Sequence, residues 1–277
     1  MITAPIIGIS RHRILRDGKG ITTLVGLMGC NLSCAYCINQ GLLRTSNANF
    51  PLMTPKEVLD KVKVDDIYFR ATNGGIVFGG GEPLLHPEFI EEFRMICPAD
   101  WRIIIETSLN VSEDAVLMVL DVVDEFIVDI KDSDSLIYHR YTGGTNEKVK
   151  SNLELLAHQG LNSKVSVRIP LIPEYNTWTN VRHSIAELKS LGYHDISVLK
   201  YIKHTDANGH KINSNDLTGK QKCRLLKYVR KVVSESNGLF FNDTICHTQQ
   251  CAGTCPKCEK ELKDLSIQLQ KLHTYII

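Results

Sequence analysis

The sequence lacks the features of several broad classes of protein. None of its apolar runs approaches the length of a membrane span. Neither charge is in excess, with 32 Lys and Arg against 31 Asp and Glu, so nothing indicates a nucleic-acid or membrane-binding surface. In the first residues, MITAPIIGISRHR, the basic side chains follow the apolar stretch, which is the reverse of a secretory signal. We therefore expect a cytoplasmic protein that binds neither nucleic acid nor membrane.

What the sequence does contain is an alternation of apolar runs with helix-like segments. Strand-like runs lie at 21–28, 74–80, 101–109, 125–131, 164–172 and 195–202. Helices are expected from the capping box at Thr54 to Glu57 and near 87–96, 112–121, 146–159 and 178–191. Repeated strand–helix units predict a parallel sheet, and strands that are apolar on both faces favour closure. We predict an α/β fold, a partial (β/α)6 TIM-like barrel with function at the carboxyl ends of its strands.

The carboxy-terminal part of the chain has a different composition. A polar stretch at 203–219 leads to a helix expected near 220–236, and cysteines follow. The hydrophobic content of 43% is enough for one sizeable core with a small appendage. We expect a core domain at 1–239 and a Cys-rich extension at 240–277.

Cysteines are concentrated in two short stretches, which is unlike a disulfide framework and typical of metal ligands. The first stretch, Cys30, Cys34 and Cys37, has the spacing C-x3-C-x2-C directly after the run at 21–28. Structural zinc favours four closed ligands, whereas three local cysteines suit a [4Fe–4S] cluster that leaves one iron open. Simple buried thiols are the other alternative.

This triplet, with Tyr36 before its last cysteine, resembles the motif of the radical S-adenosylmethionine (SAM) enzymes. A second motif, GGGEP at Gly79 to Pro83, ends the second strand-like run; taken alone it is a glycine-rich turn. In that family the glycines let backbone groups approach the amino group of the methionine moiety of SAM. The resemblance implies that SAM occupies the open iron of a cluster held by the three cysteines. The implied SAM contacts in these motifs are Tyr36, Asn39, Gly80, Gly81 and Glu82.

Residues 10–200 more closely resemble the activating enzymes of glycyl radical enzymes, such as pyruvate formate-lyase activating enzyme. The stretch RDGKGITTLVGLMGC resembles the D-G-P-G-x-R approach of that family. IETS, VDIK and VRIPLIPEYN follow the order and spacing of its E/D-T, D-[IL]-K and R-x-P-x-I-P-G-[YF]-[ND] signatures. The sequence departs from the family pattern at Lys19, Thr22, Ile38 and Glu174.

The same resemblance implies roles for polar residues near the strand ends. Lys131 would meet the carboxylate of SAM, Arg168 would meet the ribose region, and Asp17 would touch the glycine-bearing loop of the substrate. A monovalent-cation site beside SAM would include Glu106, Thr107 and Asp129. Without the cysteine motif, the same residues would be ordinary strand-end ion pairs, a barrel plug and a turn residue.

The implied activity is that of a SAM-dependent iron–sulfur oxidoreductase. One electron from the reduced cluster would cleave SAM to methionine and a 5′-deoxyadenosyl radical, which would take hydrogen from a glycine of a partner glycyl radical enzyme. Flavodoxin or ferredoxin would supply the low-potential electron. The alternative is a radical SAM enzyme that modifies a peptide or small molecule directly with an auxiliary Fe–S cluster. An electron carrier or a zinc-based interaction module has no reason to keep the SAM motifs.

The tail CHTQQCAGTCPKC repeats the spacing C-x3-C-x2-C and adds one more cysteine. A closed set of four predicts an auxiliary [4Fe–4S] cluster or a structural zinc ion, with unliganded thiols as the third reading. The set is Cys246, Cys251, Cys255 and Cys258. Cys97 and Cys223 stand apart in the sequence and are predicted to be core or surface thiols.

Overall fold

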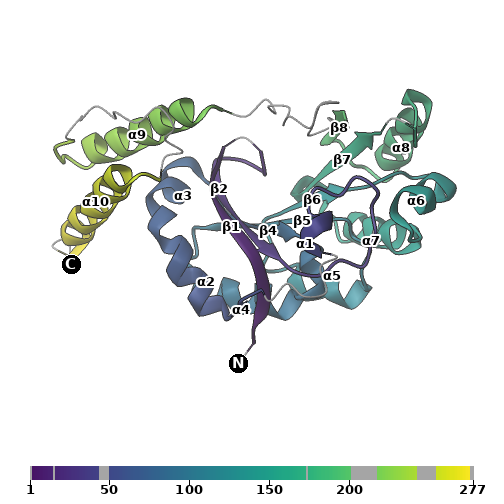
Figure 1. Cartoon of the computed structure of the whole chain (residues 1–277), viewed down its shortest axis with the longest axis horizontal. Helices are drawn as coiled ribbons and strands as arrows, with labels where there is room; N and C mark the ends of the chain where they lie inside the picture. Colours follow the sequence, from purple (N-terminus) through teal and green to yellow (C-terminus); the bar gives the residue numbers. More distant parts are fainter. Residues whose placement is uncertain are drawn as a thin grey trace.

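The computed structural model describes residues 2–14, 16–43, 50–172, 174–200, 217–241 and 254–274. Within these ranges one sheet has eight strands in the order β3-β1-β2-β4-β5-β6-β7-β8 (Figure 1). The strands are β1 (Ala4–Ile14), β2 (Ile21–Leu27), β3 (Leu52–Met53), β4 (Gly75–Gly80), β5 (Arg102–Thr107), β6 (Glu125–Asp129), β7 (Val165–Leu171) and β8 (Ile196–Lys200). The α-helices are α1 (Gln40–Leu43), α2 (Pro55–Val62), α3 (Asp66–Thr72), α4 (Pro87–Ile96), α5 (Glu113–Val119), α6 (Ser135–Thr142), α7 (Glu147–His158), α8 (Trp178–Ser190), α9 (Gly219–Ser236) and α10 (Pro256–Thr274).

The prediction of a partial (β/α)6 barrel is confirmed. β2 pairs in parallel with β4, and β4 to β8 continue the parallel sheet in sequence order. Each of these six strands falls on one of the apolar runs. The sheet is open, because β3 and β8 lie at opposite ends of the strand order. All six carboxyl ends meet at one edge, which we call the strand-end edge.

Two strands were not predicted from the sequence. β1 pairs antiparallel with β2, and the short β3 pairs antiparallel with β1. They extend the sheet beyond the parallel unit. The loop between β1 and β2 therefore lies at the opposite edge from the strand ends, where β2 begins.

The predicted helices are present, and α2 shows why its start could be predicted. The side chain of Thr54 accepts a hydrogen bond from the amide of Glu57, and the carboxylate of Glu57 accepts one from the Thr54 amide. Pro55 occupies the first turn, where it costs no intrahelical hydrogen bond. The short α1, α3 and α6 and the long α10 were not predicted.

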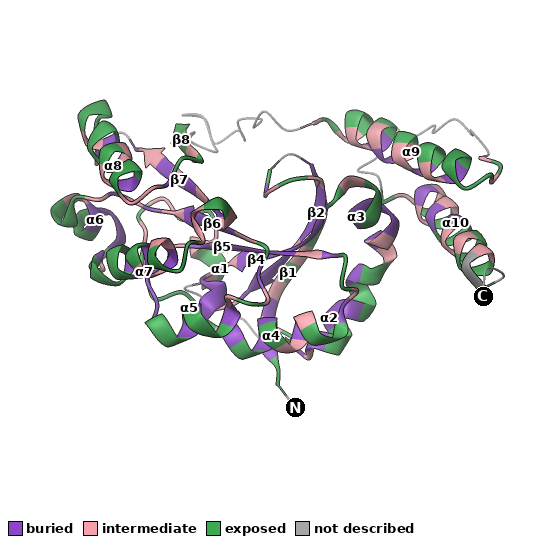
Figure 2. Ribbon diagram, turned by 180° about the vertical axis from the view of Figure 1, so that it is seen from behind, coloured by how far each residue is buried: buried purple, intermediate pink, exposed green. Residues whose placement is uncertain are grey.

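Side chains alternate between two cores on the two faces of the parallel strands. The larger core lies between the sheet and the helices, and Figure 2 shows buried residues along the strands with exposed residues on the outer helix faces. A smaller apolar layer fills the barrel interior with Val77, Ile104 and Ile127. Because side chains two positions apart on a strand point to the same face, the polar residues two positions further along the same strands also point into the barrel interior.

Helices α9 and α10 lie side by side against α3 at one end of the molecule, on the opposite side from α8 (Figures 1 and 2). A separate apolar cluster joins them to the barrel, with Tyr68 of α3 packed against Leu226 of α9 and Leu262 of α10. Arg11 of β1 also pairs with Glu259 of α10 at 2.9 Å. We call this pair of helices the carboxy-terminal hairpin. Within the described residues, no helix is long and apolar enough to cross a membrane.

Candidate active site

The three cysteines of the first motif lie in the loop that leaves β2 at the strand-end edge. Cys30 is exposed, and Cys34 and Cys37 are partly exposed. Two hydrogen bonds hold the loop against the end of α6, because the amides of Ser33 and Ala35 donate to carbonyls of that helix at 2.8 and 2.9 Å. The predicted position of the thiols, at the end of the first parallel strand, is the position that the structure shows.

The glycine motif packs directly against this loop. The amide of Gly81 donates to the carbonyl of Leu27 at 3.0 Å, and the amide of Glu82 donates to the carbonyl of Gly29 at 2.7 Å. A Cβ at position 81 would lie 1.9 Å from the Gly29 oxygen, so only glycine fits there. The Asn39 side-chain amide adds a hydrogen bond of 2.7 Å to the carbonyl of Gly80. The two motifs therefore form one continuous surface.

Glu82 is buried, with 1% of its surface exposed, and its carboxylate faces the end of β5. It accepts hydrogen bonds from the Thr107 hydroxyl at 2.6 Å and from the amide and hydroxyl of Ser108 at 2.9 and 2.7 Å. In the described structure Glu82 and Thr107 bind one another. Their contacts with SAM stay predictions.

The predicted polar residues of β5, β6 and β7 meet inside the barrel. By the alternation of side chains along a strand, Glu106, Asp129 and Arg168 point to the same face of the sheet as the interior apolar layer. Arg168 Nη1 lies 2.7 Å from Glu106 Oε1. Lys131 Nζ lies 3.5 Å from Asp129 Oδ2. The other oxygen of Asp129, Oδ1, is buried without a hydrogen-bond partner among the described residues. An unsatisfied buried carboxylate oxygen is costly, so it marks a position where a cation or donor is expected.

Charge is unevenly compensated in this interior. Burial and the carboxylates of Asp129 and Asp17 raise the pKa of Glu106 to about 7, although nearby arginines oppose the shift. Burial lowers the pKa of Lys131, but Asp129 and the Cys34 thiol outweigh it, so its pKa lies above the ordinary value. Burial also raises the pKa of Cys34, and Lys131 partly reverses that shift. Lys131 is therefore a fixed positive charge between the thiols and the carboxylates.

Asp17 lies in the β1–β2 loop and is buried, with 2% exposed. Both of its oxygens accept hydrogen bonds from Arg13. Arg168 links this loop to the interior, since its Nη2 donates to the Arg16 carbonyl at 2.6 Å and lies 3.9 Å from Asp17 Oδ1. Sequence reasoning found Asp17 and Arg168 but missed Arg13 and Arg16, because nothing in the sequence showed that β1 pairs with β2.

An aromatic cluster beside the cysteine loop was also missed. The Tyr36 ring lies 6.3 Å from that of Tyr141 and 5.7 Å from that of Tyr175, and the last two are 5.2 Å apart. The Arg140 guanidinium lies 5.2 Å from the centre of the Tyr175 ring. Tyr141 belongs to α6, a short helix that was not predicted although Asp134 caps its start and Gly143 ends it, so only Tyr36 was found.

The donor set fits a [4Fe–4S] cluster with one open iron. Three thiols share one loop, and the adjoining glycine turn leaves backbone exposed where a side chain would clash. Within the described residues, no group of three or more His, Cys, Asp or Glu side chains is arranged closely enough to hold a metal ion. The [4Fe–4S] cluster is therefore supported by the residue types and by their position at the end of β2. It is not supported by the distances between the three thiols in the described structure.

The family model of the radical SAM superfamily matches residues 25–196. The chain belongs to the radical SAM superfamily. The matched segment starts in β2 and ends at β8, so it covers the parallel barrel and both motifs. Membership of the superfamily implies a [4Fe–4S] cluster and SAM as cofactors of this radical SAM enzyme.

Relatives of this radical SAM enzyme include activating enzymes. It is 28% identical over 238 residues to pyruvate formate-lyase-activating enzyme of Clostridium pasteurianum, covering 79% of this chain and 94% of the relative. It is 34% identical over 125 residues to (2S)-3-sulfopropanediol dehydratase activating enzyme of Klebsiella oxytoca, a match that spans 45% of this chain and 39% of that relative. The crystal structure of Streptococcus suis SuiB bound to S-adenosylmethionine has a TM-score of 0.51 at 16% identity, covering 79% of this chain and 49% of that chain. The last match supports the fold.

Two of the tail cysteines, Cys255 and Cys258, lie on the hairpin, away from this site. Cys255 and Cys258 stand at the beginning of α10, and Cys246 and Cys251 lie outside the described residues. Cys223 of α9 is buried, as predicted for a core thiol, but it does not stand alone, because it packs against Cys258. Cys97 is buried in the main core.

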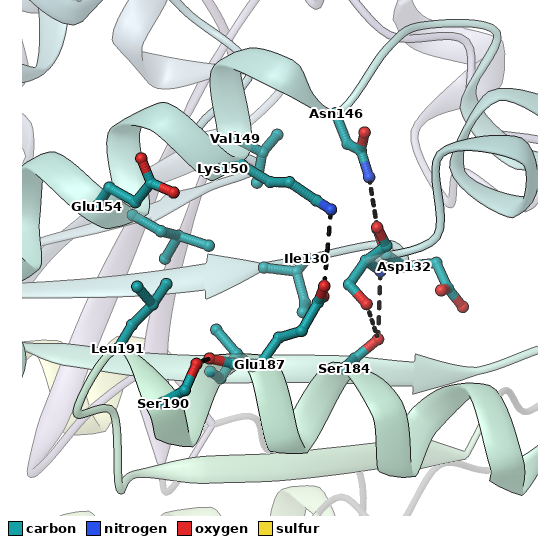
Figure 3. A pocket seen from close by; sticks show the side chains of 13 residues that line it. Ile130, Asp132, Asn146, Val149, Lys150, Glu154, Ser184, Glu187, Ser190 and Leu191 are labelled. Atoms are coloured by element: carbon teal, nitrogen blue, oxygen red, sulfur yellow. Dashed lines mark hydrogen bonds and ion pairs between the residues drawn. The ribbon is translucent and has the colours of Figure 1, made fainter.

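A cavity of about 240 Å³ between α7 and α8 is distinct from the radical SAM site. Figure 3 shows Lys150 of α7 and Glu187 of α8 facing one another across it, with Nζ and Oε1 3.8 Å apart. Its lining includes Ile130, which points to the outer core, and none of the predicted site residues. The cavity therefore lies on the helix side of the sheet.

Proposed function

We propose that this radical SAM enzyme installs a radical on a glycine of a partner glycyl radical enzyme. The observation that carries the proposal is the joined surface of the cysteine loop and the glycine turn above the polar barrel interior. The alignment with nearly the whole length of a pyruvate formate-lyase-activating enzyme supports it. The division into a core at 1–239 and an extension at 240–277 belongs to the same proposal.

Cys30, Cys34 and Cys37 would hold the [4Fe–4S] cluster, and the turn at Gly80 and Gly81 would receive SAM. When bound, the reduced cluster and SAM would supply a 5′-deoxyadenosyl radical for hydrogen abstraction from the substrate. Tyr36 and Asn39 would contact SAM from the cluster loop. Asn39 is suited to this position because its hydrogen bond to Gly80 fixes it at the junction of the two motifs.

The polar interior would orient SAM and exclude water. Lys131, a fixed positive charge, would bind the SAM carboxylate, and Arg168 would lie at the ribose. The unpartnered oxygen of Asp129 and the carboxylate of Glu106 would hold a monovalent cation together with Thr107. A cation there would give the buried Oδ1 of Asp129 a partner. Glu82 would support this arrangement through the end of β5 and contact SAM through the glycine turn.

Asp17 would act on the substrate glycine loop only indirectly, because it is buried in the β1–β2 loop at the edge opposite the cysteine motif. Its carboxylate is held by Arg13, and its neighbour Arg168 reaches the interior carboxylates, so the β1–β2 loop is tied to the site. The electron would come from flavodoxin or ferredoxin, because thiolate-bound clusters reach strongly reducing potentials. The tail cysteines would hold a separate centre, an auxiliary [4Fe–4S] cluster or zinc.

A glycine is a suitable target because its radical is delocalised between the flanking amide nitrogen and carbonyl. Hydrogen abstraction by a primary alkyl radical is therefore downhill, and no Cβ crowds the planar carbon. Anaerobically reconstituted protein, mixed with SAM, reductant and a panel of purified glycyl radical enzymes, is expected to produce a glycine-centred doublet in electron paramagnetic resonance. One SAM should be consumed for each radical.

The matched controls are Cys34→Ala, which should give neither radical nor SAM cleavage, and Asp17→Ala, which should suppress the radical and spare uncoupled cleavage. The second candidate function is direct modification of a peptide or small molecule, which the additional thiols of the tail favour. Many turnovers on such a substrate, without a glycyl signal from any member of the panel, would overturn the proposal in favour of this second function.

A further inference from the structure

The carboxy-terminal hairpin brings together three thiols from two helices. Cys223 comes from α9, Cys258 comes from the first turn of α10, and Cys255 directly precedes that helix. Cys258 is 4% exposed and Cys223 is 7% exposed, and Cys255 packs against both in a cluster separate from the main core. Cys223 and Cys255 are 32 positions apart, so their meeting is a property of the folded hairpin.

A buried cation adjoins these thiols. Arg230 of α9 is 1% exposed, and its Nη2 lies 3.7 Å from Cys258 Sγ. Its Nη1 donates to the Tyr68 hydroxyl at 2.5 Å, and its Nη2 pairs with Glu261 at 2.8 Å. The third nitrogen, Nε, is buried and has no hydrogen-bond partner among the described residues. The guanidinium is therefore paired with one carboxylate and keeps one buried donor unused among the described residues.

Packing of neutral thiols does not account for this arrangement. A neutral cysteine behaves as a small apolar side chain, and burying a guanidinium with an unused donor beside three of them is unfavourable. A metal centre changes the balance, because thiolate ligands carry negative charge and a zinc ion or Fe–S cluster with several thiolates remains anionic overall. Arg230 is then the charge that offsets it, as outer partners of metal ligands commonly do.

We propose that Cys223, Cys255 and Cys258 bind one thiolate-ligated metal centre, zinc or an iron–sulfur cluster, with Arg230 as its buried counter-charge. The sequence pointed to Cys246, Cys251, Cys255 and Cys258, of which the first two lie outside the described residues, and the structure adds Cys223. A metal would draw the three sulfurs closer together than they lie in the described structure. The centre would lock α9 to α10.

The position of the cluster indicates a structural role. Arg230 contacts Tyr68 of α3, and the ring of Tyr68 lies 5.2 Å from that of His12, which binds Asp65 at 3.0 Å. Asp65 in turn accepts from Thr23, near the beginning of β2. The cysteine loop leaves the other end of this strand, which is about 20 Å long. The hairpin thiols therefore lie behind the barrel, on the helix side, away from the SAM surface.

The test is the metal content of the full chain, purified and reconstituted without oxygen, and of Cys223→Ser, with Cys97→Ser as a matched control of another buried cysteine. Wild-type protein should contain about eight irons, or about four irons and one zinc. Cys223→Ser should lose the second centre, about four irons or one zinc, and Cys97→Ser should lose nothing. Wild-type content in Cys223→Ser, or no second centre in the wild type, would overturn the proposal.

A second measurement needs only the wild-type chain and covers the case in which Cys223→Ser does not fold. Stripping the metal should accelerate alkylation of Cys223, measured by mass spectrometry, in step with Cys255 and Cys258. Alkylation of Cys97 should keep its rate. If the rate at Cys223 is unchanged while Cys258 accelerates, Cys223 is not a ligand. Neither readout depends on SAM cleavage or glycyl radical formation, so failure here is distinct from failure of the proposed activity.

Discussion

Two groups of cysteines in this chain lie in different surroundings, although each includes a C-x2-C pair, Cys34 and Cys37 in one and Cys255 and Cys258 in the other. The strand-end group lies in a loop, with Cys30 exposed and glycine backbone beside it. The hairpin group lies at helix positions, with Cys223 and Cys258 buried. Each has a cation nearby, the partly exposed Lys131 in the first group and the buried Arg230 in the second.

The difference teaches that spacing predicts candidate thiolate ligands, whereas the surroundings of those thiols indicate how a bound centre would be used. A loop with free backbone on one side leaves room for a small molecule at an open iron. A pair of packed helices leaves no such room and suits a closed structural centre. Each prediction below tests this contrast through a matched pair of variants.

The largest expected effect separates the two groups directly. Cys34→Ala should reduce formation of 5′-deoxyadenosine from SAM to background, because the cluster loses one of its three ligands. Cys258→Ala should retain cleavage at a similar rate per folded protein. Product is measured by liquid chromatography after anaerobic reconstitution and reduction with dithionite. Equal loss in both variants would show that the hairpin centre takes part in the reaction.

The next effect concerns the support of the strand-end edge. Glu82→Ala leaves the buried donors of Thr107 and Ser108 without an acceptor, so the free energy of unfolding should fall by about 2–3 kcal/mol. Glu82→Gln keeps one acceptor oxygen and should lose about half as much. Urea denaturation measures both. Unchanged stability with weakened SAM binding in Glu82→Ala would show that this carboxylate acts only on the ligand.

Lys131 and Arg230, the cations beside the two groups of cysteines, provide the third test. Lys131→Ala should weaken SAM binding about 10-fold or more, because a charged hydrogen bond to the SAM carboxylate is lost. Lys150→Ala, at the cavity between α7 and α8, and Arg230→Leu in the hairpin should leave SAM affinity unchanged. Isothermal titration of the reconstituted protein measures these affinities. An effect of Arg230→Leu as large as that of Lys131→Ala would contradict the separation of the two sites.

The smallest effect tests strain. Leu109 and Glu174 follow the ends of β5 and β7 with left-handed φ values of 56° and 74°, whereas the described hairpin residues include no such non-glycine position. Relatives' signatures place glycine where Glu174 stands, so Glu174→Gly should raise the free energy of unfolding by up to about 1 kcal/mol. Glu154→Gly, on the exposed face of α7, should lower it by about 1 kcal/mol. The Arg140 side chain donates to the backbone carbonyl of residue 174 and can do so in either variant. A loss of stability in Glu174→Gly would therefore show that the left-handed backbone of Glu174 is not strained.

Much of the parallel barrel could be predicted because each strand is a short apolar run followed by a helix with local start signals, as at Thr54 and Pro55. β1 could not, since its burial depends on pairing with β2 and its sequence carries Arg11, His12 and Arg13. Each of these polar side chains binds a buried carboxylate of another segment or of the following loop, Asp65 for the first two and Asp17 for the third.

In the candidate active site and the hairpin, too, local sequence signals could be predicted and contacts that depend on tertiary structure could not. The cysteine and glycine motifs could be found because their spacing is local, and the superfamily match confirms the family. Arg13, Tyr141 and Cys223 could not, because each meets its partner only through tertiary structure: strand pairing, a short helix and the hairpin. The role of each predicted SAM contact stays a prediction.

The contact between Gly81 and the cysteine loop limits how this enzyme can be rearranged. Positions 29 and 81 are 52 residues apart, yet the carbonyl of the first occupies the space where a side chain of the second would stand. We therefore expect that the two segments can be exchanged between relatives only as one unit. A chimera that takes its cysteine loop from one relative and its glycine turn from another has to match both backbones to a fraction of an ångström, whereas the helices outside the barrel can be exchanged one at a time.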